Sequence, residues 1–83
     1  MTIVESIEKF LINEVVADHG KKSLSPDDDL LEQQIIDSLG IMKLVVFLEE
    51  TFNIQIADED IIPGNFQSLS AMARFVEQTR ANN

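Results

Sequence analysis

Residues 38–52 constrain the fold most, because their apolar side chains recur at the period of an α-helix. At about 100° per residue, five of them gather on one face: Ile41, Leu44, Val45, Leu48 and Phe52. Asp37 stands directly before this segment, where a side-chain oxygen can accept a hydrogen bond from a free backbone N–H group. The segment therefore predicts a helix over 38–52, capped by Asp37, that packs one face on a core.

Two other segments also predict helices with recognisable starts. Thr2 and Glu5 have the spacing of a capping box, and an apolar stripe follows: Ile3, Val4, Ile7, Phe10, Leu11 and Val15. We expect this helix to fade at 18–20, where Gly20 offers a left-handed cap. Ser68 is expected to cap a last helix whose apolar face holds Leu69, Met72, Ala73 and Val76.

The connections complete the predicted architecture. Residues 21–36 form a long loop whose five apolar residues predict contact with the core: Leu24, Leu30, Leu31, Ile35 and Ile36. Residues 53–56 look extended but have no partner strand, and 58–62 predict a short helix stopped by Pro63. The chain is thus expected to be one all-α domain over residues 1–83, a four-helix bundle of three main helices and one short one.

Composition excludes several function classes. Fifteen acidic against six basic residues give a net charge of −9, which argues against nucleic acid and anionic membranes and favours basic partners. The absence of cysteine leaves no disulfide, thiolate metal site or thiol nucleophile. The longest apolar run, 44–48, is too short to span a bilayer, and the N-terminus lacks the segments of a signal peptide. We therefore expect a soluble, monomeric, cytoplasmic protein.

Ser38 is the leading candidate for chemistry. It lies on the first turn of the predicted helix over 38–52, the end at which free backbone N–H groups and the helix dipole favour an anion. A phosphate ester on its hydroxyl would be well placed there. The simpler interpretation is a serine that only helps to cap the helix.

The residues around Ser38 carry a family resemblance. Apolar and acidic positions flank it in a long run: Leu30, Leu31, Glu32, Ile35, Ile36, Asp37, Leu39, Gly40, Leu44, Val45, Leu48, Glu49, Glu50, Phe52, Ile54, Ile56, Asp58, Glu59 and Asp60. This run, with the length, charge and helix order, resembles the acyl carrier protein family over almost the whole chain. The resemblance implies that Ser38 carries 4′-phosphopantetheine from coenzyme A, and that the thiol of this arm holds an acyl or aminoacyl group as a thioester. It implies a carrier that is not itself an enzyme.

The same resemblance implies partners. Asp37, besides capping the helix, would help a phosphopantetheinyl transferase to recognise Ser38. A loading ligase and later acyl-transfer enzymes would dock on a second apolar set, Leu39, Met42 and Val46, with Glu49 and Glu50 as rim charges. The alternatives stay open: the apolar set can pack under the long loop, and the acids can be an ordinary solvated face.

Two positions depart from the pattern of housekeeping fatty-acid carriers. Those carriers commonly have an acid directly after the Asp-Ser-Leu triplet and another one turn later, whereas this chain has Gly40 and Lys43. The positive charge at Lys43 is expected to repel the basic docking faces that such carriers meet. The run 63–66 also looks like that of stand-alone aminoacyl or peptidyl carriers. We read the chain as a carrier with dedicated partners, for an aminoacyl group or a specialised lipid.

Other functional patterns are weak. His19 is the only histidine, so no catalytic triad or zinc site can be built, and the acidic clusters lack the spacing of a calcium-binding EF-hand loop. The rival function is an unmodified acidic adaptor that binds basic proteins through the helix over 38–52. By resemblance the cargo would fold back toward a core of Leu48, Phe52, Ile56, Ile61 and Phe66, with Phe47 facing the short third helix and restricting entry.

Overall fold

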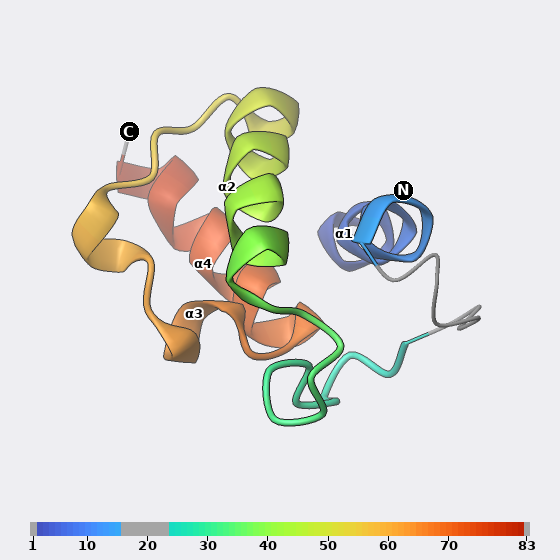
Figure 1. Cartoon of the computed structure of the whole chain (residues 1–83). Helices are drawn as coiled ribbons and strands as arrows, with labels where there is room; N and C mark the ends of the chain where they lie inside the picture. The colour runs from blue at the N-terminus through green and yellow to red at the C-terminus, as the bar shows by residue number, and fades with distance from the viewer. Residues whose placement is uncertain (1, 16–23, 83) are drawn as a thin grey trace.

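The computed structural model describes residues 2–15 and 24–82. Its helical elements, in chain order, are α1 (Ile3–Phe10), η1 (Leu11–Val15), α2 (Ser38–Phe52), η3 (Asp58–Asp60), α3 (Pro63–Phe66) and α4 (Leu69–Asn82). No strand occurs in these two ranges, and the architecture is the expected all-α, four-helix bundle of acyl-carrier type. Figure 1 shows α2 lying across α4, with α1 beside it and α3 at one end.

The start of α1 is the predicted capping box. The backbone N–H of Thr2 donates to Glu5 Oε1, and the backbone N–H of Glu5 donates to Thr2 Oγ1, each at 3.1 Å. Hydrogen bonding of the Glu5 carboxyl to the Thr2 backbone, and secondly to the Thr2 side chain, holds the pKa of Glu5 below its ordinary value. This stabilisation is therefore present at neutral pH and is lost as the pH falls through that lowered pKa. The expected end of this helix at 18–20 lies outside the described residues.

Helix α2 has the predicted bounds and a defined residue at each end. Asp37 is its N-cap, and Asn53 ends it in the left-handed conformation with φ 54°. Asparagine tolerates that conformation better than most residues, so the helix ends where the sequence permits the chain to turn. The predicted core face is confirmed: Leu44, Val45 and Leu48 are buried, and Ile41 and Phe52 pack against them half-buried.

The loop before α2 is part of the core, as its apolar residues predict. Leu24, Leu30, Ile35 and Ile36 are buried, and Leu30 is fully so. Backbone hydrogen bonds tie the loop to the α3–α4 junction: the N–H of Leu30 donates to the Gln67 carbonyl at 2.7 Å, and the N–H of Ser70 donates to the Pro26 carbonyl at 3.0 Å. At its other end the N–H of Leu24 donates to Glu8 Oε2 at 2.8 Å.

The segment after α2 differs from the sequence prediction. The helix expected over 58–62 is a single 3₁₀ turn, and Pro63, expected to stop a helix, begins α3 instead. The first helical position suits proline, because its missing N–H has no intrahelical partner there and its φ is already helical. Residues 53–56 pair with no strand, although Ile54 and Ile56 are buried.

Phe47 also differs from its expected placement. Instead of facing the third helix, its ring stacks on Phe10 of α1 with centroids 4.2 Å apart, and it meets the edge of Phe52 at 6.4 Å. The prediction failed because helical periodicity places Phe47 off the main core face without saying which neighbour that flank meets. The stack joins α1 to α2 on the outside of the core.

The core itself is entirely apolar among the described residues: no buried polar or charged side chain occurs there. Its largest fully buried side chains come from α1, η1, the loop, α2, α3 and α4: Phe66, Ile7, Leu11, Leu30, Leu44, Leu48, Leu69, Met72 and Val76. Ser68 caps α4 as expected, accepting a hydrogen bond from the Ala71 N–H at 3.1 Å. Helix α4 contacts α1, α2 and α3, so it is the element against which the bundle closes.

We expect Leu30→Ala to lower the free energy of unfolding by about 2–5 kcal/mol, because it opens a cavity under the loop that leads to α2. Leu39→Ala is the matched control, since Leu39 is 65% exposed and its truncation is expected to change stability by no more than about 0.5 kcal/mol. Urea denaturation followed by circular dichroism measures both. If the two variants had equal urea midpoints, the loop around Leu30 would not belong to the core.

Candidate functional site

Ser38 opens α2 with an exposed side chain. Among the described residues its hydroxyl has no hydrogen-bond partner, so the alcohol is available for reaction. The backbone N–H groups of Ser38 and Leu39 belong to the first turn, where a helix offers no acceptor of its own. An exposed alcohol beside free N–H groups at the positive end of a fifteen-residue helix suits a phosphate ester.

Asp37 is the N-cap predicted from the sequence. Its Oδ1 accepts a hydrogen bond from the backbone N–H of Gly40 at 2.9 Å, and the backbone carbonyl of Asp37 accepts from the Ile41 N–H at 2.9 Å. The cap leaves the side chain exposed beside Ser38. The carboxylate thus fixes where the helix starts and also places a negative charge next to the Ser38 hydroxyl.

The residues before Asp37 hold the helix start in place. The backbone N–H groups of Ile35 and Ile36 both donate to the Leu30 carbonyl, at 2.9 and 3.2 Å, and the two isoleucine side chains are buried. Gln34 makes the turn that precedes them with φ 59°. Because Leu30 is itself bonded to Gln67, Ser38 is attached through a short hydrogen-bonded turn to the α3–α4 junction.

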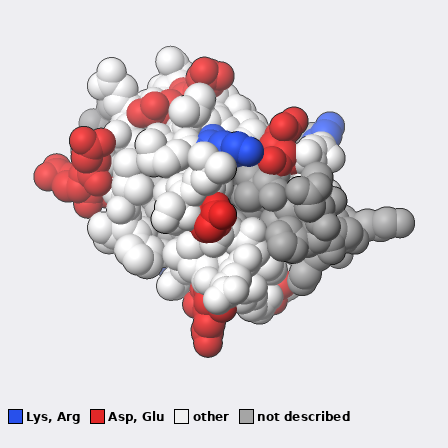
Figure 2. Space-filling model, in the orientation of Figure 1, with Lys and Arg blue, Asp and Glu red and all other residues white. Residues whose placement is uncertain are grey.

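The second apolar set of α2 lies on the surface. Leu39, Met42 and Val46 are 65%, 55% and 52% exposed, which rules out the alternative that they pack under the long loop. We call these three residues the apolar strip. In the view of Figure 2, most of the acidic side chains lie toward the margins of a largely uncharged face, one lies near its middle, and basic side chains are few. A surface of this kind suits a transient protein contact, with apolar area at its centre and charges at its rim.

The two acids near the end of α2 differ. Glu49 is half-buried, and its Oε2 accepts a hydrogen bond from the backbone N–H of Ile56 at 2.9 Å. Glu50 is fully on the surface. Glu49 therefore holds the segment that follows α2 against the helix, a role that the sequence pattern did not predict, whereas Glu50 is free to meet a ligand or partner.

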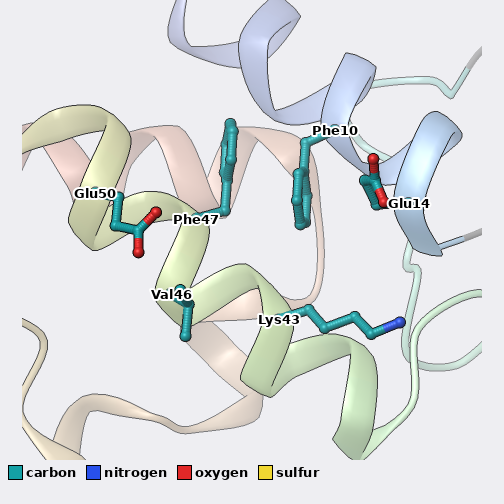
Figure 3. A pocket seen from close by; sticks show the side chains of 6 residues that line it. All are labelled: Phe10, Glu14, Lys43, Val46, Phe47 and Glu50. Atoms are coloured by element: carbon teal, nitrogen blue, oxygen red, sulfur yellow. The ribbon is translucent and has the colours of Figure 1, made fainter.

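A pocket of about 400 Å³ lies between α1–η1 and α2. Figure 3 shows its six lining residues: Phe10, Glu14, Lys43, Val46, Phe47 and Glu50. Sequence analysis singled out Lys43, Val46 and Glu50 but missed Phe10 and Glu14 as site residues. No local signal marks those two, because their part in the pocket depends on how α1 packs beside α2.

The described residues offer neither a metal site nor a membrane-spanning helix. Within residues 2–15 and 24–82, no three His, Cys, Asp or Glu side chains are grouped so as to hold a metal ion. None of the described helices is both long enough and apolar enough to cross a membrane. His19, the one histidine, lies outside the described residues.

The comparisons with known proteins agree with one another. Residues 11–76 match the family described as a phosphopantetheine attachment site. A probable acyl carrier protein, PigG, of Serratia sp. (strain ATCC 39006) is 32% identical over 92% of this chain and 91% of its own length. The D-alanyl carrier protein of Streptococcus pyogenes serotype M5 (strain Manfredo) is 27% identical over 93% of this chain and 89% of its own. Both relatives thus match over nearly the full length of this chain and of their own chains.

We expect Asp37→Ala to destabilise the protein by about 1 kcal/mol, because the N–H of Gly40 loses its acceptor. Asp37→Asn keeps an oxygen in the same place and is expected to retain most of the stability while removing the charge. Thermal unfolding of the three proteins measures this. If the asparagine variant were as unstable as the alanine variant, the charge and not the hydrogen bond would account for the stabilisation.

Glu49→Ala is expected to cost about 1–3 kcal/mol of stability, because it leaves the backbone N–H of buried Ile56 without its charged acceptor. Glu50→Ala, on the neighbouring exposed residue, is the control and is expected to be nearly neutral. Chemical denaturation compares the two. Equal stability of both variants would argue that the Glu49 hydrogen bond contributes nothing.

Proposed function

Because the chain belongs to the phosphopantetheine-binding family of acyl and aminoacyl carrier proteins, we propose that Ser38 is the residue that bears its 4′-phosphopantetheine group. The observation that carries this assignment is the exposed hydroxyl at the capped start of α2, inside the matched residues 11–76. When bound, the group supplies a thiol that holds the cargo as a thioester. The protein is therefore a carrier that presents cargo to enzymes, and it is not an enzyme itself.

The other described serines in the matched range are less suitable. Ser68 caps α4, and the Ser70 hydroxyl donates to Asp27 Oδ1 at 3.2 Å. Ser25 is exposed, but it lies in the loop before Pro26 and not at a helix start. Ser38 alone among these four combines an unengaged hydroxyl with the positive end of a long helix.

The proposed attachment is a phosphoryl transfer to Ser38. The serine oxygen bonds to the phosphorus of coenzyme A that bears the pantetheine, and the bond from this phosphorus to the bridging oxygen of the pyrophosphate breaks. Adenosine 3′,5′-bisphosphate leaves, and the serine proton passes to a base of the transferase. In the product, the free N–H groups of the first turn of α2 stabilise the negative phosphodiester. This chain contributes the nucleophilic oxygen and that electrostatic setting.

We assign partner recognition to the surface of α2. Asp37 offers a phosphopantetheinyl transferase a negative charge beside Ser38, and the apolar strip gives the transferase, a loading ligase and later acyl-transfer enzymes a contact area. Lys43 and Glu50 lie at the edge of that area with opposite charges, where they affect partner choice and association rate more than affinity.

An aminoacyl group is the cargo that we favour. Support comes from Gly40 and Lys43, which replace the acids usual in fatty-acid carriers, and from a relative named as a D-alanyl carrier protein. Lys43 is exposed, so its charge meets any partner that docks on α2. Loading by a general malonyl transferase as fast as that enzyme loads its own carrier would contradict this assignment.

Incubation with coenzyme A and a broad-specificity phosphopantetheinyl transferase is expected to add one phosphopantetheine to the wild type and none to Ser38→Ala. Intact mass spectrometry measures the increment. Ser25→Ala, which removes a second exposed serine of the described residues, is the matched control and is expected to be modified like the wild type.

Modification of Ser38→Ala would place the attachment at another residue. An unmodified wild type that also carries no group when purified would instead favour the adaptor function, in which Ser38 only caps a helix. In that case binding of basic proteins to α2 would survive the Ser38→Ala change, because the apolar strip is untouched.

A further inference from the structure

We propose that the pocket between α1 and α2 receives the aminoacyl cargo, with its ammonium group facing Glu50 and its side chain on the two phenylalanines. This inference rests on the proposed function, because the cargo reaches the pocket only when it is tethered at Ser38. It assigns a binding role to Phe10 and Phe47, whose stacked rings otherwise only join α1 to α2.

The first support is position along one helix. Val46 and Phe47 follow Ser38 by eight and nine residues, which places them ~12–14 Å farther along α2, and Glu50 lies ~18 Å along it. Around the helix axis, the apolar strip occupies the angles between Ser38 and the pocket. A flexible arm rooted at Ser38 thus has an apolar path to the pocket. Tethering also gives the cargo an effective concentration of about millimolar, so a weak site is enough.

The second support is the shape and chemistry of the pocket. The Phe10 and Phe47 rings stack at 4.2 Å and form an apolar wall, which Val46 extends toward the exposed side of α2 (Figure 3). The volume of about 400 Å³ is at the small end of ligand sites. This volume admits an aminoacyl group, and the choice of cargo therefore rests on the charges around the pocket.

The third support is the distribution of charge around that wall. In Figure 3 the Glu50 carboxylate lies toward one end of the pocket, while Lys43 extends toward the end at which Glu14 lies. The lysine therefore offsets Glu14 more than Glu50. The end near Glu50 keeps a negative charge, within a chain whose net charge is −9, and it favours a cation.

The bundle core is a poor alternative for such a cargo. Among the described residues it contains no polar or charged side chain, and Leu48 and Phe66, two residues of the core expected to receive a cargo, are fully buried. An ammonium group moved there would lose its hydration without gaining a partner, which is far more costly than leaving it at the surface. A charged cargo is therefore expected on the outer pocket, even though a fatty chain would favour the interior.

The test compares an alanyl cargo with an isobutyryl cargo. The two groups have nearly the same shape, but only the alanyl group carries an ammonium. The ¹⁵N-labelled protein is modified at Ser38 with pantetheine analogues that carry either group through a stable amide, and intact mass confirms loading. We expect the alanyl form to shift the amide resonances of Phe10, Val46, Phe47 and Glu50 relative to the isobutyryl form.

Glu50→Gln is expected to abolish this difference, and added salt is expected to reduce it, because an exposed pair of charges is screened. Glu77→Gln on α4 is the matched control: it also removes one exposed acid and is expected to retain the difference. Identical pocket shifts for the two cargos, or shifts confined to the first turn of α2, would overturn the inference while leaving the proposed function intact. Failure to load Ser38 at all would overturn both.

Discussion

The hydrogen bond from the Leu30 N–H to the Gln67 carbonyl, together with burial of the Leu30 side chain, is the constraint on which the site depends. Residue 30 stands between a polar loop and the start of α2, and its own carbonyl accepts from the two isoleucines that follow. Without this anchor, Asp37 would still cap a helix, but the turn that leads to it would lose its direct hydrogen bond to the α3–α4 junction. Ser38 is exposed, yet the turn just before it is held by two hydrogen bonds from Ile35 and Ile36 to the Leu30 carbonyl.

Acidic side chains perform three different tasks in this small bundle. Glu5 and Asp37 show the first task, which is to accept hydrogen bonds from free N–H groups at helix starts. Glu8 and Glu49 show the second, each accepting from the backbone of a distant segment, Leu24 and Ile56. The third is to remain in solvent as Glu50 does. The large negative charge is thus partly structural, and only some of it is available to partners.

Local patterns predicted the helices well, because caps and apolar periodicity act within a few residues. The start of α2 at Ser38 followed from such patterns and is confirmed, whereas the exposure of Leu39 decides between two interpretations that the sequence left open. The failures concern tertiary contacts: Phe47 meets α1 instead of the short third helix, and Glu49 binds a backbone group seven residues away. Pro63 was misread because proline both ends and begins helices, and only the fold distinguishes the two.

An interior without hydrogen-bonding side chains, as in the described part of this bundle, has consequences for how such a chain changes over evolutionary time. No interior position there demands one particular partner, so apolar residues of similar volume can replace one another, several at once, at small cost. The polar residues that cap the helix starts have less freedom, because a replacement must keep an oxygen acceptor in the same place. Mutational drift is therefore expected to accumulate inside the bundle, while the geometry around the serine stays the same.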